Sequence, residues 1–594
     1  MAQSSKDRGA FFPRTLGLAF SALAAAGAFM LFLQFGWSDG LDAMDIVRAV
    51  FILISTFWLA WGAMQAVLGL MSRAMPPALP PFTGLRSKTA ILVPVYNEDP
   101  VTVYSRIAAM DASLLATGQA EHFHFAILSD TRKEDVALQE RIWFERLLDA
   151  CHGEGRMFYR RRENNKGRKA GNIEDFFQRS GGAYDFALIL DADSLMEGDT
   201  IVEMARRMEA EPELGLLQTL PKVTRAKARF GRAMQFSASF HSPIFARGLA
   251  MMQGATGPFW GHNAIVRCRA FAESCGLPEL PGKPPFGGHI MSHDYVEAAL
   301  LARAGWLVRL DDDLEGSFEE GPENIVDHAK RDRRWCQGNL QHSKIVNAPG
   351  LRAWNRFVFV QGILSYISPL FWLGFIIASI FAPWFTPPVN YFPVEGWPFP
   401  IFPSDETWKA IGLAIGIFGL LFLPKLLVAA DAITSGRAKQ FGGAGLVFRS
   451  TLVELVFSSI TAPIFMMFQT RSVLQVVFGA DGGWPTNNRG DGTLPLSESW
   501  SGTWWIVLWG VVVLSATWFL APGLVPWLLP IAVPMILAPF VVSWTSRASR
   551  TRLFLTPLDI EPSPVMLMQD RILAGWQGTA REPAPDLMAM PAQA

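Results

Sequence analysis

Cysteine is scarce in this chain, with four residues in 594. They form neither a C-x-x-C pair nor a cysteine–histidine spacing typical of zinc sites, and they are Cys151, Cys268, Cys275 and Cys336. The sequence therefore argues against a disulfide framework and against structural zinc, and it predicts reduced cytosolic thiols.

An excess of either charge is also absent. The 52 basic and 53 acidic residues give a formal net charge of −1, which argues against a nucleic acid or another polyanion as a partner. Only 18% of the residues are charged, whereas 50% are hydrophobic, with 21 tryptophans and 44 phenylalanines. A composition this apolar is typical of an integral membrane protein rather than of a soluble enzyme.

Two uncharged runs, at 15–38 and 49–72, are each long enough to cross a hydrocarbon core of about 30 Å as a helix. The first run is too long, and too closely followed by the second, to be a cleaved signal peptide. Basic residues flank the pair and acidic residues lie between the two runs: Lys6, Arg8, Arg14, Arg73, Arg86 and Lys88 against Asp39, Asp42 and Asp45. The positive-inside rule then places the tail of residues 1–14 and the chain from 73 onward in the cytoplasm.

Four further spans are predicted within 356–544, and they lie at 357–382, 410–430, 504–521 and 524–544. A proline- and aromatic-rich connection at 383–403 suits the outer interface. Three arginines, Arg547, Arg550 and Arg552, follow the last span. Residues 545–594 are therefore expected to be a cytoplasmic tail, mostly extended because it is rich in proline.

The apolar run at 452–470 is the exception. It contains Glu454 and Pro463, and a full crossing there would put the basic tail on the wrong side of the membrane. The segment near 448–480 is therefore predicted to be re-entrant or interfacial, with TRSVLQVVF as an in-plane helix. A seventh full span remains the alternative, since the charge rule is statistical.

The region 73–355 is predicted to be one domain with its own core, because its polar part contains no uncharged run of bilayer length. Short apolar runs at 89–96, 124–129, 186–191 and 214–219 alternate with helix-like stretches at 101–116, 135–150 and 200–209. This alternation predicts an α/β domain with a mainly parallel sheet.

Polar side chains follow these predicted strands at their carboxyl ends, where ligands bind in such sheets. Tyr96 and Glu98 follow the first strand, and Asp130 follows the second. Asp191 and Asp193 follow the third strand, in LDADS. We expect these side chains to meet around a nucleotide.

Asp191 and Asp193 form a D-x-D pair. Two carboxylates at a strand end can hold Mg²⁺ or Mn²⁺ together with phosphate oxygens. An Asx turn that caps the next helix is the alternative.

Lys169 lies in NNKGRKAGN, a basic, glycine-interrupted loop at 164–172 that could approach a diphosphate. A solvated basic loop that opens a helix is the alternative.

Asp294 lies at the start of an apparent helix in HIMSHDYVEAALLARAGW. A carboxylate at this place can remove the proton from an acceptor hydroxyl, a contribution of about a hundred- to ten-thousandfold. A helix N-cap is the structural alternative, and His293 is the alternative base.

Two aromatic segments suit the acceptor and the leaving group. In KRDRRWCQGNLQH, Trp335 can stack on a sugar and Arg334 can stabilise the leaving-group charge, although a basic cluster before a span is also what the charge rule predicts. FWGHNAIVR offers Trp260 and His262 as a sugar-contacting loop, unless it is only a hairpin.

Together these segments resemble the membrane-embedded family 2 glycosyltransferases, the group of the cellulose, hyaluronan and chitin synthases. The resemblance covers the central domain and the flanking spans. It implies an integral membrane α-helical protein with a cytoplasmic α/β GT-A glycosyltransferase domain inserted between transmembrane helices. It also implies roles for residues that match the family's motifs: Tyr96 and Asp130 for uridine, Lys169 of K-A-G-N, Asp191 and Asp193 of D-x-D, Asp294 of T-E-D, and Arg334 and Trp335 of Q-x-x-R-W.

The chain departs from these motifs in two places. Arg331 replaces the glutamine of Q-x-x-R-W, and T-E-D has become Ser292, His293 and Asp294. The acceptor-site geometry is therefore expected to differ from that of cellulose synthases.

Four segments of the chain resemble those of one subfamily, the glucans biosynthesis glucosyltransferase H proteins. They are PVYNEDP, SHDYVEAALLARAGW, KRDRRWCQGNLQH and WPTNNRGDG. The resemblance implies a bacterial inner-membrane, inverting enzyme that uses UDP-glucose and Mg²⁺ (or Mn²⁺). The implied product is the β-1,2-linked backbone of osmoregulated periplasmic glucans. The growing glucan, the lipid bilayer and periplasmic glucan-processing proteins are the implied partners, and export through the spans after 341 is an open possibility.

Three other functions remain as alternatives. One is a glucosyltransferase that acts on a lipid carrier, such as polyprenyl phosphate or a diacylglycerol. The second is a transporter or channel with an inactive nucleotide domain, which the acidic residues at every motif position disfavour. The third is a regulatory nucleotide sensor, which does not require the base residue Asp294.

Overall fold

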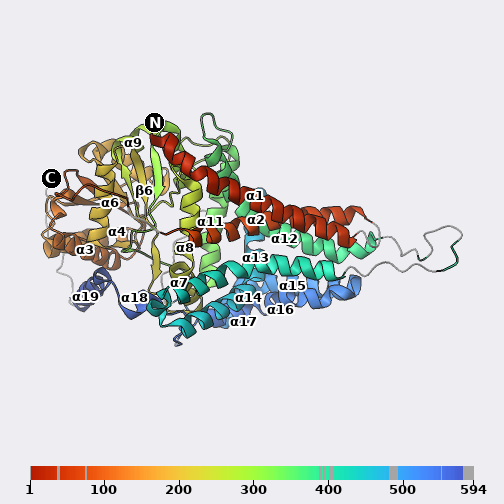
Figure 1. Ribbon diagram of the computed structural model, residues 1–594. Coiled ribbons are helices and arrows are strands. Elements are labelled where there is room, and N and C mark those ends of the chain that lie inside the picture. Colours follow the sequence, from red (N-terminus) through yellow and green to blue (C-terminus); the bar gives the residue numbers. More distant parts are fainter. Residues whose placement is uncertain are drawn as a thin grey trace.

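The computed structural model describes residues 2–36, 41–73, 77–386, 391, 397–399, 407–480, 492–549 and 551–579. An α/β domain occupies one end of the molecule, and long helices extend from one side of it (Figure 1). The fold class predicted from the sequence, an α/β domain between sets of membrane-length helices, is therefore confirmed.

A seven-stranded sheet with the order β3-β2-β1-β4-β8-β6-β9 forms the centre of the domain. Its strands are β1 (Thr89–Val95), β2 (Phe123–Ser129), β3 (Met157–Arg161), β4 (Phe186–Ile189), β6 (Leu214–Gln218), β8 (Ala264–Arg267) and β9 (Leu307–Leu310). Neighbouring strands are parallel except where β8 runs antiparallel to both β4 and β6. The four predicted strands are all present, and the sheet is mixed because of β8.

The strands are short apolar runs because helices cover both faces of the sheet. In β4, Phe186 and Leu188 pack on one side with helices α3 (Pro100–Ala116), α4 (Glu134–Cys151) and α6 (Gly198–Ala210). Ala187 and Ile189 pack on the other side with α5 (Arg168–Ser180), α9 (Cys268–Ser274) and α10 (His293–Ala304). The three helices predicted at 101–116, 135–150 and 200–209 are α3, α4 and α6.

A second, three-stranded sheet lies beside the first. It consists of β5 (Leu195–Met196), β10 (Ser317–Glu320) and β7 (Lys222–Thr224), in that order. Because β5 follows the end of β4 after only a short turn, this small sheet lies close to the D-x-D segment.

Six of the long helices are apolar enough to cross a membrane: α1 (Ala2–Gly36), α2 (Ala43–Met71), α12 (Ala353–Phe381), α13 (Thr407–Thr434), α14 (Ala444–Val477) and α15 (Leu496–Leu520). Helices α16 (Val525–Ile536) and α17 (Ala538–Thr545) form a further apolar pair, bent by 59°. Helices α1, α12 and α13 pack against α2 (Figure 1). The described residues thus contain six helices of span length, or seven if the bent pair crosses as one.

Helix α14 is continuous over the segment predicted to be re-entrant or interfacial, and Pro463 lies inside it without ending it. The rings of Phe465 and Phe230, in α7 (Arg229–Phe240), are 6.1 Å apart. One turn later, Gln469 donates a hydrogen bond to Asp332 of α11 (Ile325–Gln341) at 3.2 Å. A re-entrant loop requires the chain to reverse, so the re-entrant part of the prediction is wrong. The interfacial placement and the alternative of a full span both stay untested, because α14 is also long and apolar enough to cross a membrane.

The prediction of a mostly extended tail is wrong for the described residues. Helices α18 (Pro557–Ile560) and α19 (Pro564–Thr579) form there, and α19 packs on α3. The reason is a pair of buried side chains, Val565 and Met566, that join the core of the domain. Asp570 accepts a hydrogen bond from Arg225 at 2.7 Å and adds a polar contact. Residues 580–594 lie outside the described part.

Two other predictions fall largely outside the described residues. The connection at 383–403 is described only at its start and at a few residues within it, and the motif WPTNNRGDG only at Gly492. Neither the outer-interface placement nor the motif's structure is therefore tested.

Two glycines allow a helix of the domain to pack closely on the second helix of the chain. Helix α8 (Ser242–Gln253) packs on α2. A Cβ atom at Gly248 of α8 would lie 1.9 Å from the carbonyl oxygen of Gln65, and one at Gly69 of α2 would lie 1.9 Å from that of Ile244. The two helix backbones can approach this closely only because both residues are glycine.

We expect Gly248→Ala to destabilise the protein, although alanine favours helices over glycine by about 1 kcal/mol. The added methyl group must push α2 and α8 apart, and overpacking of this kind costs about 1–3 kcal/mol. A lowered melting temperature of the purified protein in detergent would report this. Gly62→Ala in α2 is the control, because nothing lies within 4 Å of a Cβ atom there. A melting temperature of Gly248→Ala equal to that of the control would contradict the close contact.

Candidate active site

The carboxyl ends of β1 and β2 bring the first predicted nucleotide residues together. Tyr96 and Glu98 follow β1, and the backbone amide of Tyr96 donates a hydrogen bond to the Glu98 carboxylate. Asp130 follows β2, and its amide donates to the carbonyl oxygen of Val95 at 2.9 Å. The three residues therefore lie at neighbouring strand ends, as predicted.

Asp130 is held by an arginine that the sequence analysis missed. Arg162, directly after β3, donates to both Asp130 carboxylate oxygens, from Nε at 2.8 Å and from Nη2 at 2.7 Å. The same guanidinium donates to the carbonyl oxygens of Lys166 and Arg168, at 3.2 and 3.0 Å. This paired geometry fixes the orientation of the carboxylate. In the sequence, Arg162 is only one member of a basic run, and nothing distinguishes it from its neighbours.

Lys169 reaches across to the D-x-D segment because of a tight turn before α5. Gly167 has φ of 72°, and a Cβ atom there would lie 2.9 Å from the Cα atom of Gly171. After this turn the Lys169 ammonium donates to the carboxylate of Asp191 and to the carbonyl oxygen of Gly261, the latter at 2.7 Å. The basic loop is therefore not merely solvated, since its lysine bridges two other segments.

Asp191 and Asp193 lie directly after β4, half-exposed on either side of the buried Ala192. The Asp191 carboxylate pairs with Lys169, and helix α6 begins after Glu197 without a side-chain cap. The Asx-turn alternative therefore does not describe Asp191. Burial alone would raise the pKa of Asp191, but Lys169, His262 and Arg331 together hold it below its ordinary value. Asp191 is therefore a carboxylate at neutral pH.

A divalent cation fits this pair only with oxygen ligands from a substrate. Among the described residues, no three histidine, cysteine, aspartate or glutamate side chains are arranged to hold a metal ion. Mg²⁺ commonly takes one or two protein carboxylates and completes its shell with phosphate oxygens and water. The donor set of Asp191 and Asp193 suits that mode of binding for Mg²⁺ or Mn²⁺.

A buried glutamine holds the loop that contains Trp260 and His262 in place through hydrogen bonds. Gln218, the last residue of β6, accepts a hydrogen bond from the amide of Trp260 at 3.0 Å and donates to the carbonyl oxygen of His262 at 3.0 Å. The Ser194 hydroxyl donates to the side-chain oxygen of Asn263 at 2.5 Å. This loop precedes β8 and lies against the D-x-D segment, so it is not a simple hairpin. Gln218 was missed, although a polar residue at the end of an apolar strand was a signal for it.

Glu319 is an acidic residue that the sequence analysis missed. Its carboxylate lies 3.5 Å from Nε2 of His262. Burial raises the pKa of Glu319, His262 and Arg331 oppose this, and the charges of Asp193 and Asp191 raise it further. Glu319 therefore shares the electrostatic environment of the D-x-D pair. It belongs to β10, far away in the sequence, and SFEE carries no pattern that would reveal it.

Asp294 is the second residue of α10, and Ser292 rather than Asp294 occupies the N-cap position. A Cβ atom at Gly261 would lie 3.5 Å from a carboxylate oxygen of Asp294. Gly261 also accepts the hydrogen bond from Lys169, so Asp294 and the Lys169–Asp191 pair both lie next to this glycine. Burial raises the pKa of Asp294, with His293 opposing and Glu297 adding to the increase.

His293, the alternative base, faces a different acid. Its Nδ1 atom lies 3.1 Å from the carboxylate of Glu297. Burial alone would lower the pKa of His293, but Glu297 and Asp294 raise it above the ordinary value. Because Glu297 makes His293 hold its proton more tightly, this histidine is less available as a proton acceptor, whereas Asp294 lies against the loop that contains Trp260 and His262.

Arg334 and Trp335 come to the same place from α11. Burial, with the charge of Arg331, lowers the pKa of Arg334 to about 10, while Asp191 and Asp294 oppose the decrease. The guanidinium of Arg331 lies 4.6 Å from the centre of the Trp335 ring, a cation–π contact. Trp335 remains 36% exposed. Arg331, which stands where the family has glutamine, thus lies against the Trp335 ring and adds positive charge near Asp191 and Asp193.

A glycine allows α11 to approach the Asp294 segment. A Cβ atom at Gly338 would lie 2.2 Å from the hydroxyl oxygen of Ser292. His342 also contacts the carbonyl oxygen of Ser292, at 3.0 Å. These contacts fix Asp294 relative to Arg334 and Trp335.

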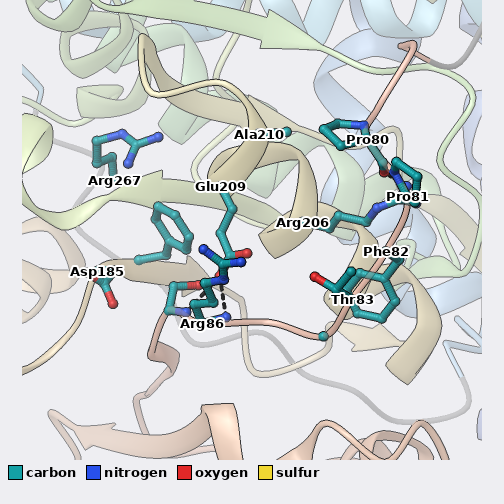
Figure 2. Close-up of a pocket in the computed structure, with 13 residues that line it drawn as sticks. Pro80, Pro81, Phe82, Thr83, Arg86, Asp185, Arg206, Glu209, Ala210 and Arg267 are labelled. Carbon is teal, nitrogen blue, oxygen red and sulfur yellow. Dashed lines mark hydrogen bonds between the residues drawn. The ribbon is translucent and has the colours of Figure 1, made fainter.

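A cavity of about 520 Å³ lies elsewhere, at the opposite end of β4. It is bordered by the linker between α2 and β1, where the amides of Arg86 and Ser87 donate hydrogen bonds to Glu209 at 2.8 and 2.7 Å (Figure 2). Asp185, before β4, lines it, whereas Asp191 follows β4. This cavity is therefore separate from the site.

Sequence comparisons identify the domain. The profile described as Glycosyl transferase family 2 matches residues 90–274, and that described as Glycosyl transferase family group 2 matches residues 186–403. The matched region contains β1 to β10 and all the site residues from Tyr96 to Trp335. The domain is therefore a GT-A-like glycosyltransferase domain with a mixed sheet.

Solved structures give a weaker likeness. A mannosyltransferase from Pyrobaculum calidifontis, in complex with GDP-Man and Mn²⁺, has a TM-score of 0.43 and 15% identity, over 66% of this chain and 96% of that one. The mannosyl-3-phosphoglycerate synthase from Rubrobacter xylanophilus has a TM-score of 0.27 and 13% identity, over 45% of this chain and 77% of that one.

Full-length relatives share one description, glucans biosynthesis glucosyltransferase H. The protein from Cereibacter sphaeroides is 69% identical over 98% of this chain and 97% of its own length. Those from Rhodopseudomonas palustris and a Shewanella species are 40% and 38% identical, over 96% and 92% of this chain and 80% and 76% of theirs. The chain therefore belongs to the glucans biosynthesis glucosyltransferase H family and is a glycosyltransferase.

Proposed function

We propose that this enzyme transfers glucose from UDP-glucose, with inversion, to a growing β-1,2-linked glucan at the inner face of the bacterial inner membrane. One observation carries the proposal. The Lys169 ammonium bridges Asp191 and the carbonyl oxygen of Gly261, and Asp294 lies against the same glycine. Groups suited to a diphosphate and a group suited to accept a proton thus meet at Gly261, in the loop with Trp260 and His262.

The donor nucleotide is assigned to the carboxyl edge of the sheet. Tyr96, Glu98 and Asp130 are the groups for the uridine, and Arg162 holds the Asp130 carboxylate ready for a hydrogen bond. Lys169 is placed to contact the diphosphate beside Asp191. Asp193 and Asp191 would hold Mg²⁺ (or Mn²⁺), which when bound neutralises charge that develops on the leaving diphosphate.

Asp294 is assigned as the base. Its carboxylate removes the proton of the acceptor hydroxyl as the hydroxyl oxygen forms a bond to the anomeric carbon and the bond to the diphosphate breaks. Direct displacement from the opposite face converts an α-linked donor into a β-linked product. Burial excludes water from the carboxylate, which raises its affinity for the proton.

The acceptor and leaving group are assigned to α11 and the loop before β8. Trp335 offers a partly exposed ring for a sugar, and Trp260 and His262 lie in the loop that Gln218 holds next to the D-x-D segment. Arg334, under the influence of both Asp191 and Asp294, supplies positive charge for the departing nucleotide.

The membrane arrangement is proposed from contacts of α14 with the domain. Near its start, the Ser450 hydroxyl accepts a hydrogen bond from the amide of Phe554, and near its end the side-chain oxygen of Gln475 accepts one from Arg333. Phe554 belongs to the tail expected in the cytoplasm and Arg333 belongs to the domain, so the two ends of this 34-residue helix both contact cytoplasmic parts, and the helix is assigned to the membrane surface. The other four C-terminal spans then return the tail to the domain, where α19 packs on α3. Glucan export through these spans completes the proposal.

The product assay tests the function itself. Purified protein in lipid vesicles is given UDP-[14C]glucose with Mg²⁺, and the product is extracted and its linkages are analysed. We expect water-soluble β-1,2-linked glucan. Label recovered only in the organic phase would support transfer to a lipid carrier instead.

Neutralisation of the D-x-D pair should abolish synthesis. We expect Asp193→Asn and Asp191→Asn each to lower glucan formation by at least about a hundredfold, since electrostatic groups of this kind contribute about 10²–10³ to the rate. EDTA should do the same to the wild-type enzyme, with recovery on addition of Mg²⁺. Asp199→Asn, an exposed aspartate in the first turn of α6, is the matched control. Substantial activity in the two variants would overturn the assignment.

The pH dependence should reveal Asp294. A base must be deprotonated, so activity should fall as the pH drops through the Asp294 pKa, which lies above that of an ordinary aspartate. His293→Gln removes a positive charge that lowers this pKa, so the acidic limb of the kcat profile should move to higher pH. A limb that stays in place or moves to lower pH would contradict the coupling.

Cysteine labelling should separate an interfacial α14 from a spanning one. In a Cys151→Ser background, Gly445→Cys and Phe478→Cys place thiols near the two ends of α14, and Phe478 is 83% exposed. Both should resist a membrane-impermeant maleimide in spheroplasts and react after permeabilisation. Gly523→Cys, at the turn between α15 and α16, should react without permeabilisation. Opposite labelling of 445 and 478 would establish a spanning α14.

A further inference from the structure

Arg14, the last charged residue before the first apolar run, points into the protein rather than toward lipid or water. Its Nε donates a hydrogen bond to the carbonyl oxygen of Met252 at 2.6 Å, and its Nη2 donates to that of Gln253 at 2.8 Å. Nη2 also lies 3.3 Å from the hydroxyl oxygen of Thr256. The guanidinium lies 4.3 Å from the centre of the Trp354 ring, at the start of α12. One side chain of the first span therefore contacts the domain and the third span.

The carbonyl groups that Arg14 contacts belong to a helix end. Met252 and Gln253 are the last two residues of α8, and the final carbonyls of a helix have no partner within it. A cation there satisfies these acceptors and opposes the negative end of the helix dipole. Arg14 thus acts as the C-terminal cap of α8, although it comes from a segment more than two hundred residues earlier in the chain.

The approach of the first span to this cap is close. A Cβ atom at Gly17, one turn after Arg14, would lie 2.7 Å from the terminal carbon of Met252. Met252 is completely buried with Trp61 and other apolar side chains of the first, second and third spans. The end of α8 therefore has little freedom to move relative to the membrane helices.

The chain that leaves this cap leads directly to the sugar-contacting loop. Gly254 ends α8 with φ of 56°, and the amide of Gly257 donates to the carbonyl oxygen of Val308 at 2.8 Å. Trp260 and Gly261 follow within a few residues, and Gly261 lies against Asp294. We define residues 254–263 as the acceptor loop. Its entry is fixed by Arg14, and its far end is fixed by Gln218.

A simpler explanation accounts for a basic residue here but not for its contacts. The positive-inside rule requires positive charge before a first span, and Lys6 and Arg8 already provide it. It requires no particular hydrogen bonds. The paired hydrogen bonds to one helix end, together with the stacked tryptophan, use the planar geometry that only arginine offers.

We propose that Arg14 is a positioning residue for glucosyl transfer: by capping α8 from the first membrane span, it sets the acceptor loop against Asp294. The proposal rests on the function proposed above, in which this loop receives the acceptor sugar. It predicts that Arg14 matters more for transfer to the acceptor than for binding of UDP, whose uridine is assigned to the ends of β1 and β2. The membrane helices would thereby take part in the geometry of catalysis.

The test compares Arg14→Ala with the wild-type enzyme, both reconstituted in vesicles. Glucan synthesis, release of free glucose from UDP-glucose and the affinity for UDP are measured on the same samples. We expect glucan synthesis to fall by at least about tenfold, because a displacement of about 1 Å can cost about a hundredfold in rate. The ratio of free glucose to glucan should rise, and the affinity for UDP should stay within about twofold of the wild type. Arg73→Ala, which removes an exposed arginine after the second span, is the control for loss of interfacial charge.

A conservative variant keeps the test decisive if Arg14→Ala does not fold. Arg14→Lys keeps the charge but loses the paired, planar contact, so it should show the same raised ratio of free glucose to glucan with a smaller loss of synthesis. Wild-type ratios in the folded variants, or a parallel loss of UDP affinity and synthesis, would overturn the proposal for Arg14. Failure of the wild-type enzyme to make glucan from UDP-glucose would instead overturn the proposed function.

Discussion

The balance of charge at the candidate site determines how the helices of the domain pack on the carboxyl edge of the sheet. Asp191, Asp193, Glu319 and Asp294 lie within electrostatic reach of one another or of shared cations. Like charges held this close in a buried site would otherwise protonate or repel. Lys169 of α5 and two arginines of α11, Arg331 and Arg334, supply the opposing charge. The site therefore exists only when α5, α10 and α11 are packed on the same edge of the sheet.

Helix α11 links this chemistry to the membrane part. The face with Arg334 and Trp335 borders the site, whereas Asp332 accepts hydrogen bonds from Tyr366 of α12 and from Gln469 of α14, each at 3.2 Å. Helix α8 makes a comparable link through its glycine contact with α2. The edge of the sheet that carries the candidate site is consequently fixed to the helices at more than one point, and in the proposed function a polymer made there would begin at the junction of domain and membrane.

Much of this arrangement could be predicted from local patterns. The strands β1, β2, β4 and β6 were visible as buried apolar runs, and the D-x-D pair was visible because it ends such a run. The antiparallel strand β8 was not, since a strand of three apolar residues and one arginine gives no sign of its direction. The tail helix α19 was missed because proline-rich composition suggested extended chain, whereas its stability comes from Val565 and Met566 in the domain core. Likewise Arg162, Gln218 and Glu319 became recognisable only by their partners.

The sequence by itself determined the class of the protein, the alternation of strands and helices, and most of the acidic and aromatic residues of the site. These follow from composition and from short-range spacing, which are properties of the chain alone. Only the tertiary structure decided which cation faces which carboxylate, that Asp294 and Lys169 meet at Gly261, and that Arg14 caps a helix far away in the chain. The physical reason is that hydrogen bonds and ion pairs between distant segments depend on how the helices pack, and no local pattern encodes that packing.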